Sequence, residues 1–223
     1  MAFGSVFSIC VAACNGGEHV LGRDCPELID DMEDGNPSII SKGRVGEWFS
    51  YNDRSDGSIQ RPPASAEVFP METLSPPRGS SLRAVHTSGS GFTGVWGAGV
   101  GFDLQLKNAY DASKYRGISF LARAGEDADL LGRTLRVNVP DGNTAAAGGR
   151  CEGEQCNDDF GKEVQLGNEF IQYELDFDEL TQAGWSGKLF EKLTLKELYG
   201  IRFQSQPNSK FDFWIDDVAF TCR

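Results

Sequence analysis

The 223-residue chain carries 33 acidic and 21 basic residues, which gives it a formal net charge of −12. An acidic surface repels phosphate backbones, so nucleic acid is a poor partner and neutral ligands are the easiest to accommodate. Glycine supplies 27 of the 223 residues, about 12% against a usual level of about 7%, which favours many turns and few long helices.

The first segment, residues 1–14, is almost uncharged and mostly apolar. It is too short to span a bilayer, which takes about 20 residues, and it is typical of a signal peptide. Its end, Val-Ala-Ala-Cys, resembles the lipobox of bacterial lipoproteins, although no Lys or Arg precedes the apolar stretch. The resemblance implies a lipid on Cys14, and the protein would then contact the membrane only through this lipid anchor. The protein is then expected to be exported, and either anchored in the cell envelope or secreted. A plain apolar N-terminus is the alternative.

Residues 15–24 form a predicted tether, and residues 25–223 hold one predicted domain, since no long linker divides them. Short alternations of polar and apolar residues predict strands, and clusters of Gly, Pro, Asn and Asp predict the turns between them. The predicted fold is all-β, a two-sheet antiparallel β-sandwich of jelly-roll type. The strands are expected at residues 47–53, 81–87, 99–106, 117–124, 134–139, 170–177, 199–206 and 211–220.

An acidic segment stands near each end of this domain, at residues 28–35 and 213–220, and each places carboxylates inside an apolar run. A strand with a buried face rarely keeps ionised groups unless something neutralises them. If the two segments lie side by side, their oxygens could surround Ca²⁺, which takes about six to eight oxygen ligands. The alternative is two solvated acidic strands that discourage edge-to-edge pairing.

Four cysteines remain when the apolar leader is set aside, and they favour disulfides in an exported protein. Cys25 and Cys222 stand just outside the two acidic segments, so they would pair if those segments do. Cys151 and Cys156 are five residues apart in a glycine-rich loop and could close a small ring. A zinc site is the alternative for these two, but further ligands at suitable spacing are missing.

Alternation also assigns side chains to faces, because successive residues of a strand point to opposite sides. Planar polar side chains can make paired hydrogen bonds to sugar hydroxyls, and the outward-facing candidates are Arg136, Asn138, Arg202 and Gln204. Aromatic rings can cover the C–H faces of pyranose rings, and the candidates are Trp48, Tyr51, Trp96, Trp185 and Trp214. A core position is the alternative for each aromatic residue. For Arg202 the alternative is a salt bridge with Glu174 or Asp176.

Motifs for catalysis are missing from the sequence. Residues 89–94 match a dinucleotide fingerprint by letters, but the glycine-rich stretch that follows cannot form the required helix. There is no Gly-x-Ser-x-Gly, and neither His19 nor His86 has a supporting motif for a triad. Acids are plentiful enough for a glycosidase pair, but nothing singles out two of them. The chain is therefore expected not to be an enzyme.

Three blocks resemble the family 11 carbohydrate-binding modules and the related complex-I-assembly (CIA-type) domains, both galactose-binding-like jelly rolls: residues 29–36, residues 170–177 with 180–185, and residues 198–204 with 213–218. The resemblance implies a concave sheet that binds a β-glucan-like chain across the planar polar residues named above. It also implies a structural Ca²⁺ between the first and last strands, held by Glu33 and Asp216 with Asp31 and Asp217 as alternates. The loop of residues 145–160 is not part of the family pattern.

The leading hypothesis is therefore a monomeric, non-catalytic lipoprotein that binds a neutral polysaccharide in the groove of the concave sheet. The second hypothesis is a glycan-active enzyme of the same fold, either a glycanase or a polysaccharide lyase. The third is a structural or assembly lipoprotein whose groove binds a protein partner.

Overall fold

The computed structural model describes residues 26–40 and 42–222. Within them, twelve strands form a seven-stranded and a five-stranded sheet, and every strand pair is antiparallel. The predicted antiparallel β-sandwich is confirmed. The predicted signal peptide, the lipidated Cys14, the tether and Cys25 lie outside the described residues.

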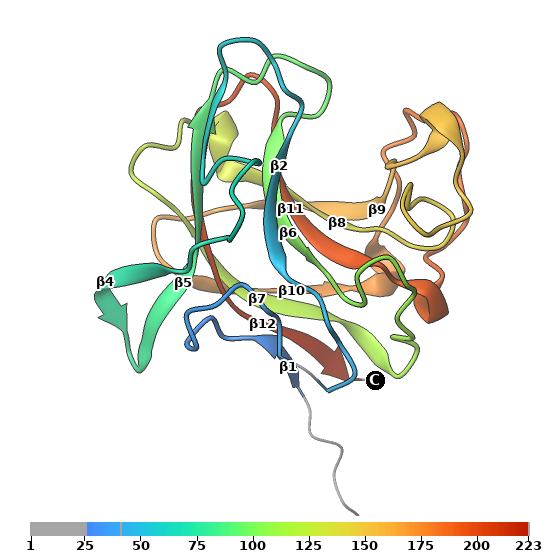
Figure 1. The fold of residues 1–223 in the computed structure, drawn as a ribbon, viewed down its shortest axis with the longest axis horizontal. Coiled ribbons are helices and arrows are strands. Elements are labelled where there is room, and N and C mark those ends of the chain that lie inside the picture. The colour runs from blue at the N-terminus through green and yellow to red at the C-terminus, as the bar shows by residue number, and fades with distance from the viewer. Residues whose placement is uncertain (1–25, 41, 223) are drawn as a thin grey trace, which may run out of the picture.

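The seven-stranded sheet joins the beginning and the end of the described chain (Figure 1). Glu27 lies opposite Phe220, as expected for two acidic segments that lie side by side. The path of the sheet runs through β10 (Ile171–Asp176), β7 (Tyr115–Ala124), β12 (Phe211–Cys222), β5 (Ser81–Ser90) and β3 (Ile59–Arg61). Two further strands lie off this path. β1 (Glu27–Asp30) pairs with β12, and β4 (Glu72–Arg78) pairs with β5.

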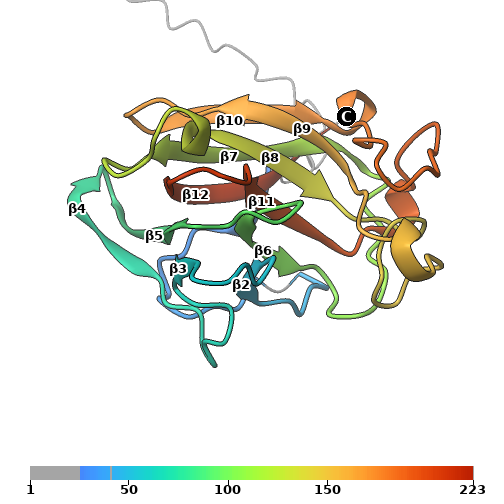
Figure 2. The same cartoon turned by 90° about the horizontal axis from the view of Figure 1, so that it is seen from above.

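The five-stranded sheet packs against the other sheet, and Figure 2 shows β9 near β10 at one edge and β2 near β3 at the other. Its order is β2 (Trp48–Asn52), β6 (Ala98–Asp103), β11 (Gly200–Ser205), β8 (Thr134–Val139) and β9 (Phe160–Gln165). Inward-facing apolar residues of both sheets form one core; for example, the rings of Phe120 and Phe203 meet edge to face at 5.0 Å. The outer face of each sheet is therefore left to polar and aromatic side chains.

Three observed strands were not predicted from the sequence: β3, β4 and β9. β3 has three residues, β4 contains Pro76 and Pro77, and β9 begins in the loop that lacked a recognisable pattern. Prolines are tolerated in β4 because it lies at an edge of its sheet. Four single-turn 3₁₀ helices complete the described chain: η1 (Leu131–Arg133), η2 (Gly153–Gln155), η3 (Phe177–Glu179) and η4 (Leu195–Glu197). None of the helices in this part of the protein has the length and apolarity that a bilayer crossing requires.

Candidate functional site

The outer face of the five-stranded sheet brings the four predicted planar polar residues together. The pairing of β11 with β8 places Arg202 opposite Asn138 and Gln204 opposite Arg136. The neighbouring residues Phe203 and Val137 point inward and are fully buried. The expectation from alternation therefore holds: these side chains share one face, and they lie in two adjacent rows across the strands.

Two aromatic residues of β2 extend the same two rows. Through β6, Phe49 lies in the row of Arg202 and Tyr51 lies in the row of Gln204. In these two rows, β6 presents Gly99 and Gly101 to this face. Sequence reasoning missed Phe49, and the signal that could have found it is the repeat of glycine at every second position of β6.

These two glycines let the flanking side chains lie flat on the sheet. A Cβ atom at Gly99 would lie 2.7 Å from the Tyr51 hydroxyl oxygen, and one at Gly101 would lie 2.9 Å from the Arg202 Cγ. Both distances are shorter than real Cβ contacts allow. The sheet thus has a glycine floor, and the phenol ring and the guanidinium side chain lie across it.

Hydrogen bonds fix the polar side chains in place. Asn138 Nδ2 donates to Gln204 Oε1 at 2.8 Å, and Gln204 Nε2 donates to the Trp96 carbonyl at 2.7 Å. Arg136 Nη2 donates to the Thr181 carbonyl at 2.6 Å, and burial lowers the pKa of Arg136. Because these rotamers are already fixed, a ligand would lose little side-chain entropy by binding to them.

The aromatic end of this face is formed by a stacked pair. The rings of Tyr51 and Trp96 lie 5.7 Å apart at an interplanar angle of 28°, and Trp96 is 39% exposed. The Arg202 guanidinium carbon lies 5.8 Å from the centre of the Phe49 ring. Burial raises the pKa of Tyr51. Among the described residues, neither the Tyr51 hydroxyl nor Arg202 Nε has a hydrogen-bond partner. Trp96 is an exposed aromatic ring at this end, whereas Phe49 and Tyr51 are half-buried.

The ion pair of Arg202 differs from the alternative that the sequence left open. Its nearest carboxylate is Asp103, at 3.8 Å from Nη2, and burial raises the pKa of Asp103. Glu174 and Asp176 belong to the other sheet, where both contact Arg116. The Arg202 side chain therefore stays on the glycine floor.

Trp185 lies at the opposite end of this face, in a loop beside β9. Its side chain is 55% exposed, and the bridge between Gly161 and Thr181 joins the start of its loop to the sheet. The buried Asp158 carboxylate accepts hydrogen bonds from the backbone N–H groups of Ala183, Gly184 and Ser186. Asp158 was missed in the sequence, where only the exposed tryptophan between two glycines pointed to this loop. The loop stands at the right of Figure 1.

The structure corrects the placement of two predicted ligand residues. Trp48 is 3% exposed and belongs to the core, where its Nε1 donates to Asp30 Oδ2 at 2.7 Å. Trp214 lies on β12 of the other sheet, so it is remote from the glycine floor. Its ring is stacked on His86 at 4.0 Å and faces the Arg123 guanidinium at 4.9 Å. Neither tryptophan can offer a free ring to a ligand on the five-stranded sheet.

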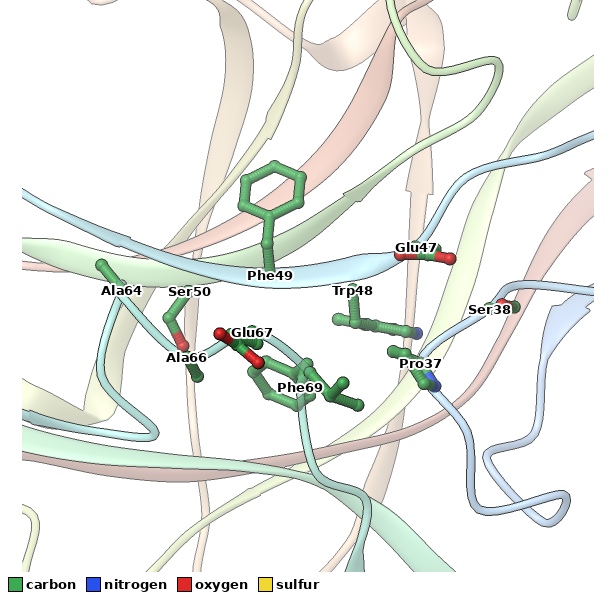
Figure 3. A pocket seen from close by; sticks show the side chains of 11 residues that line it. Pro37, Ser38, Glu47, Trp48, Phe49, Ser50, Ala64, Ala66, Glu67 and Phe69 are labelled. Atoms are coloured by element: carbon green, nitrogen blue, oxygen red, sulfur yellow. The ribbon is translucent and has the colours of Figure 1, made fainter.

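A pocket of about 350 Å³ lies beside β2, between this strand and the loop of residues 64–69. Figure 3 shows Trp48 and Phe69 together on one side of β2 and Phe49 on the other. Alternation along β2 explains this arrangement, because Trp48 and Ser50 point toward the core while Phe49 points outward. The pocket and the glycine floor are therefore separated by the strand itself.

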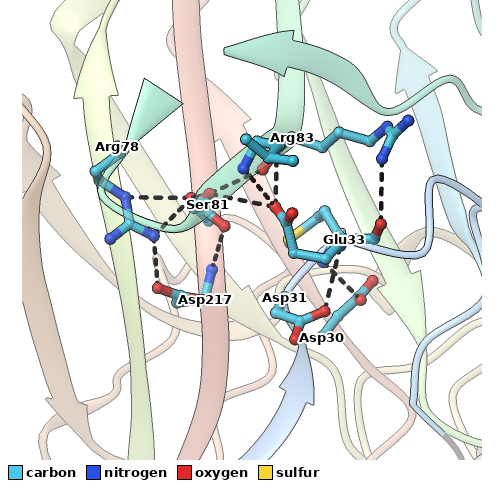
Figure 4. A network of polar contacts seen from close by, with 10 residues as sticks. Asp30, Asp31, Glu33, Arg78, Ser81, Arg83 and Asp217 are labelled. Carbon is cyan, nitrogen blue, oxygen red and sulfur yellow. Dashed lines mark hydrogen bonds and ion pairs between the residues drawn. The ribbon is translucent and has the colours of Figure 1, made fainter. Parts of the chain in front are cut away.

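The predicted metal ligands contact N–H and O–H donors (Figure 4). Arg78 donates to both Asp216 and Asp217, and Asp31 accepts from the backbone N–H of Glu33. Glu33 accepts from the N–H groups of the β4–β5 hairpin. No group of three or more His, Cys, Asp or Glu side chains in the described part of the chain is arranged to hold a metal ion. As arranged, these carboxylates do not fit a calcium site, and calcium binding stays a prediction from the sequence.

One of the two predicted disulfides lies within the described residues, and it is confirmed. Cys151 and Cys156 are bonded, with their Cα atoms 5.4 Å apart, and they close a ring in the loop before β9. Cys222 ends β12, and its predicted partner Cys25 lies outside the described residues. The pairing of Cys25 with Cys222 therefore stays a prediction.

Comparison with family models gave no match, and comparison with curated proteins gave none either. Solved structures do match. The family 11 carbohydrate-binding module of a cellulosomal cellulase of Clostridium thermocellum superposes with a TM-score of 0.57 at 16% identity, over 88% of this chain and 94% of that one. A structure of a family 11 module from the same organism, in complex with a β-1,3-1,4-mixed-linked tetrasaccharide, gives 0.57 at 17% identity, over 88% and 95%.

A third similar structure is an exo-β-agarase, with a TM-score of 0.52 at 13% identity, over 88% of this chain and 25% of that one. The match thus extends over most of the chain in all three cases. Sequence identity is low throughout, so the likeness is one of fold. The chain has the jelly-roll sandwich fold that carbohydrate-binding modules use.

Proposed function

We propose that the chain binds a polysaccharide on the outer face of the five-stranded sheet and does not cleave it. The observation that carries this proposal is the glycine floor, on which fixed planar polar side chains lie beside an exposed ring. Trp96 can cover the C–H face of a pyranose ring. Gln204 and Arg136 keep further donors and acceptors for hydroxyl groups.

The charges on this face favour a neutral glycan. Arg202 lies beside Asp103, and Arg136 lies near the carboxylates of Glu163, Asp158 and Asp159. Each guanidinium therefore already has carboxylates as counter-charges, and an anionic sugar is not needed to neutralise it. The family 11 module described above was solved with a β-1,3-1,4-mixed-linked tetrasaccharide, which supports a β-linked glycan as the ligand here. An open face buries little ligand area, so we expect modest affinity.

The position of two acids on this face, the half-buried Asp103 and the buried Asp159, favours binding without cleavage. Asp103 ends β6 and Asp159 precedes β9, and burial raises the pKa of both. Their strands are separated by β11 and β8, so the axes of these strands lie three spacings, or about 14 Å, apart. Glycosidases place their two carboxyl groups about 5 to 9.5 Å apart. These acids are therefore better explained as counter-charges for the arginines.

The proposed setting is outside the cell. The apolar leader and the lipobox-like end at Cys14 support an exported protein whose domain hangs from a lipid anchor. Residues 15–24 would then serve as the tether between the anchor and the domain. In that setting the outer face of the five-stranded sheet meets glycans directly.

A glycan array tests the proposal, with the chain produced without its first 14 residues. We expect binding to neutral β-glucans and no release of reducing ends or unsaturated sugars. Arg202→Ala should weaken binding about tenfold, or about 1.4 kcal/mol, because it removes the guanidinium that lies across the floor. Released sugar products would favour an enzyme instead. An array without any hits, together with capture of one protein partner, would favour an assembly role.

A further inference from the structure

The last strand carries an acidic bulge where it passes the β4–β5 hairpin. The register between β12 and β7 shifts between Asp216 and Ala219, and Asp217 has a left-handed φ of 48°. In a regular strand, two consecutive side chains point to opposite faces. The bulge re-aims one of them, so that Asp216 and Asp217 meet the same cation.

That cation is the guanidinium of Arg78, at the end of β4. Its Nη2 donates to Asp216 Oδ2 at 2.7 Å and to Asp217 Oδ2 at 2.6 Å, while Nε donates to Asp216 Oδ2 at 3.2 Å (Figure 4). The Asp216 side chain is fully buried, and the Arg78 side chain is 30% exposed. A buried carboxylate needs a counter-charge of this kind, and a planar guanidinium can serve two carboxylates at once.

Further donors contact the carboxylates of this cluster. Ser81 Oγ donates to Asp216 Oδ2 at 2.8 Å, and the Asp217 N–H donates to Asp216 Oδ1 at 2.9 Å. Glu33 Oε1 accepts from the N–H groups of Leu82 and Arg83, both at 2.9 Å. Glu33 therefore holds the start of β5, and it does not share a cation with Asp216.

We infer that Arg78, and not a metal ion, is the cation that neutralises the acidic bulge and ties the β4–β5 hairpin to the last strand. This assignment replaces the calcium ion that the sequence predicts at the same place. Calcium needs several oxygens directed at one point, whereas here Asp216 and Asp217 accept from the Arg78 guanidinium and Glu33 Oε1 accepts from backbone N–H groups of β5. The closure of the fold at β12 is then independent of calcium supply.

Thermal unfolding of the full-length chain separates the two assignments. If Arg78 is the cation, the melting temperature should be the same in excess EDTA and in millimolar CaCl₂, and calorimetric titration should detect no binding of Ca²⁺. If calcium holds the bulge, EDTA should lower the melting temperature by several degrees and CaCl₂ should restore it. That result would overturn the inference. The experiment uses the wild-type protein alone.

Arg78→Met is the complementary test. We expect its melting temperature to fall by about 5 to 10 °C, because the buried Asp216 carboxylate loses its counter-charge. The matched control is Arg116→Met, which removes an ion-paired but exposed arginine from the same sheet and should shift the melting temperature by about 1 °C or less. Dependence on calcium that arises only in Arg78→Met would support the inference, since the ion would then replace the lost guanidinium. Equal melting temperatures for Arg78→Met and the wild type would contradict it.

Discussion

The outer faces of the two sheets carry similar side chains in different arrangements. On the five-stranded sheet, Tyr51 and Arg202 lie across glycines, and the nearby Trp96 is exposed. On the seven-stranded sheet, Trp214 lies between His86 and Arg123, which cover its ring. The first face leaves an aromatic surface for a ligand, and the second uses its aromatic surface for internal contacts.

Cross-strand register accounts for this difference. Trp214 lies directly opposite His86 on β5 and directly opposite Arg123 on β7, so large side chains meet on both sides. Residues opposite one another in adjacent strands are close enough for such pairs to stack. Tyr51 instead lies opposite Gly99, which has no side chain to stack against it. The partner across the strand therefore decides whether an aromatic ring is covered within its own sheet, and the Tyr51 ring is stacked instead by Trp96 from a loop.

Trp48→Ala tests the distinction between core and surface tryptophans, and it should have the largest effect. Trp48 packs against Phe102 with ring centres 4.8 Å apart, and it donates to the buried Asp30. Its removal leaves a cavity and a carboxylate without that donor, so we expect a loss of about 4 kcal/mol. Urea unfolding measures this loss. Trp48→Phe, which keeps an aromatic ring, should lose less, and a loss below about 1 kcal/mol for Trp48→Ala would contradict the core placement.

The pH dependence of stability tests the contact that joins β1 to the five-stranded sheet. Burial raises the pKa of Asp30 to about 6 from an ordinary value of 3.8. The folded state therefore keeps a proton that the unfolded chain releases near pH 4, and the stability from this group falls as pH rises from about 4 to 6. The expected loss is roughly 3 kcal/mol.

The Asp30→Asn variant isolates this effect, since it removes one titrating group and retains a polar side chain. The free energy of unfolding of the wild type minus that of Asp30→Asn should decrease between pH 4 and pH 6. Both proteins share the other titrating groups, so their contributions cancel in the difference. A difference that is constant with pH would show that Asp30 titrates normally in the folded state.

Alternation predicted the sheet faces correctly, because it is a local property of each strand. Arg136, Asn138, Arg202 and Gln204 share one face as expected, and the acidic segments at the two ends lie side by side. Alternation could also have excluded Trp48 from the binding face, since Phe49 and Tyr51 occupy the other face of β2. The pattern there was ambiguous because aromatic residues occur at successive positions.

Contacts between distant strands could not be predicted in this way. Trp214 follows an alternating pattern, but only the order of the strands shows that it lies on the other sheet. The counter-charge of Asp216 was also hidden, because Arg78 lies 138 residues away in a proline-containing stretch that reads as a loop. A carboxylate cluster predicts a cation, but the sequence alone does not tell whether a side chain supplies it.

Trp96→Ala and Trp214→Ala compare the two faces directly in a binding assay. Trp96→Ala should weaken glycan binding about tenfold, about 1.4 kcal/mol, and leave the unfolding free energy nearly unchanged because the ring is exposed. Trp214→Ala should leave binding unchanged and reduce stability, since it removes the stacking partner of His86. Calorimetric titration with a β-glucan oligosaccharide measures both. The reverse result, with binding lost only in Trp214→Ala, would move the ligand to the seven-stranded sheet.

Arg116→Ala on the seven-stranded sheet should have the smallest effect. Arg116 contacts Glu174 and Asp176, but its side chain is half exposed, so water and salt screen the ion pairs. We expect a change of about 0.5 kcal/mol or less in the free energy of unfolding, smaller still at high salt, and no change in glycan binding. Urea unfolding at low and high ionic strength measures it. A loss of glycan binding in Arg116→Ala would mean that the charged edge of the seven-stranded sheet contributes to the ligand site, and the two faces could then no longer be assigned separate roles.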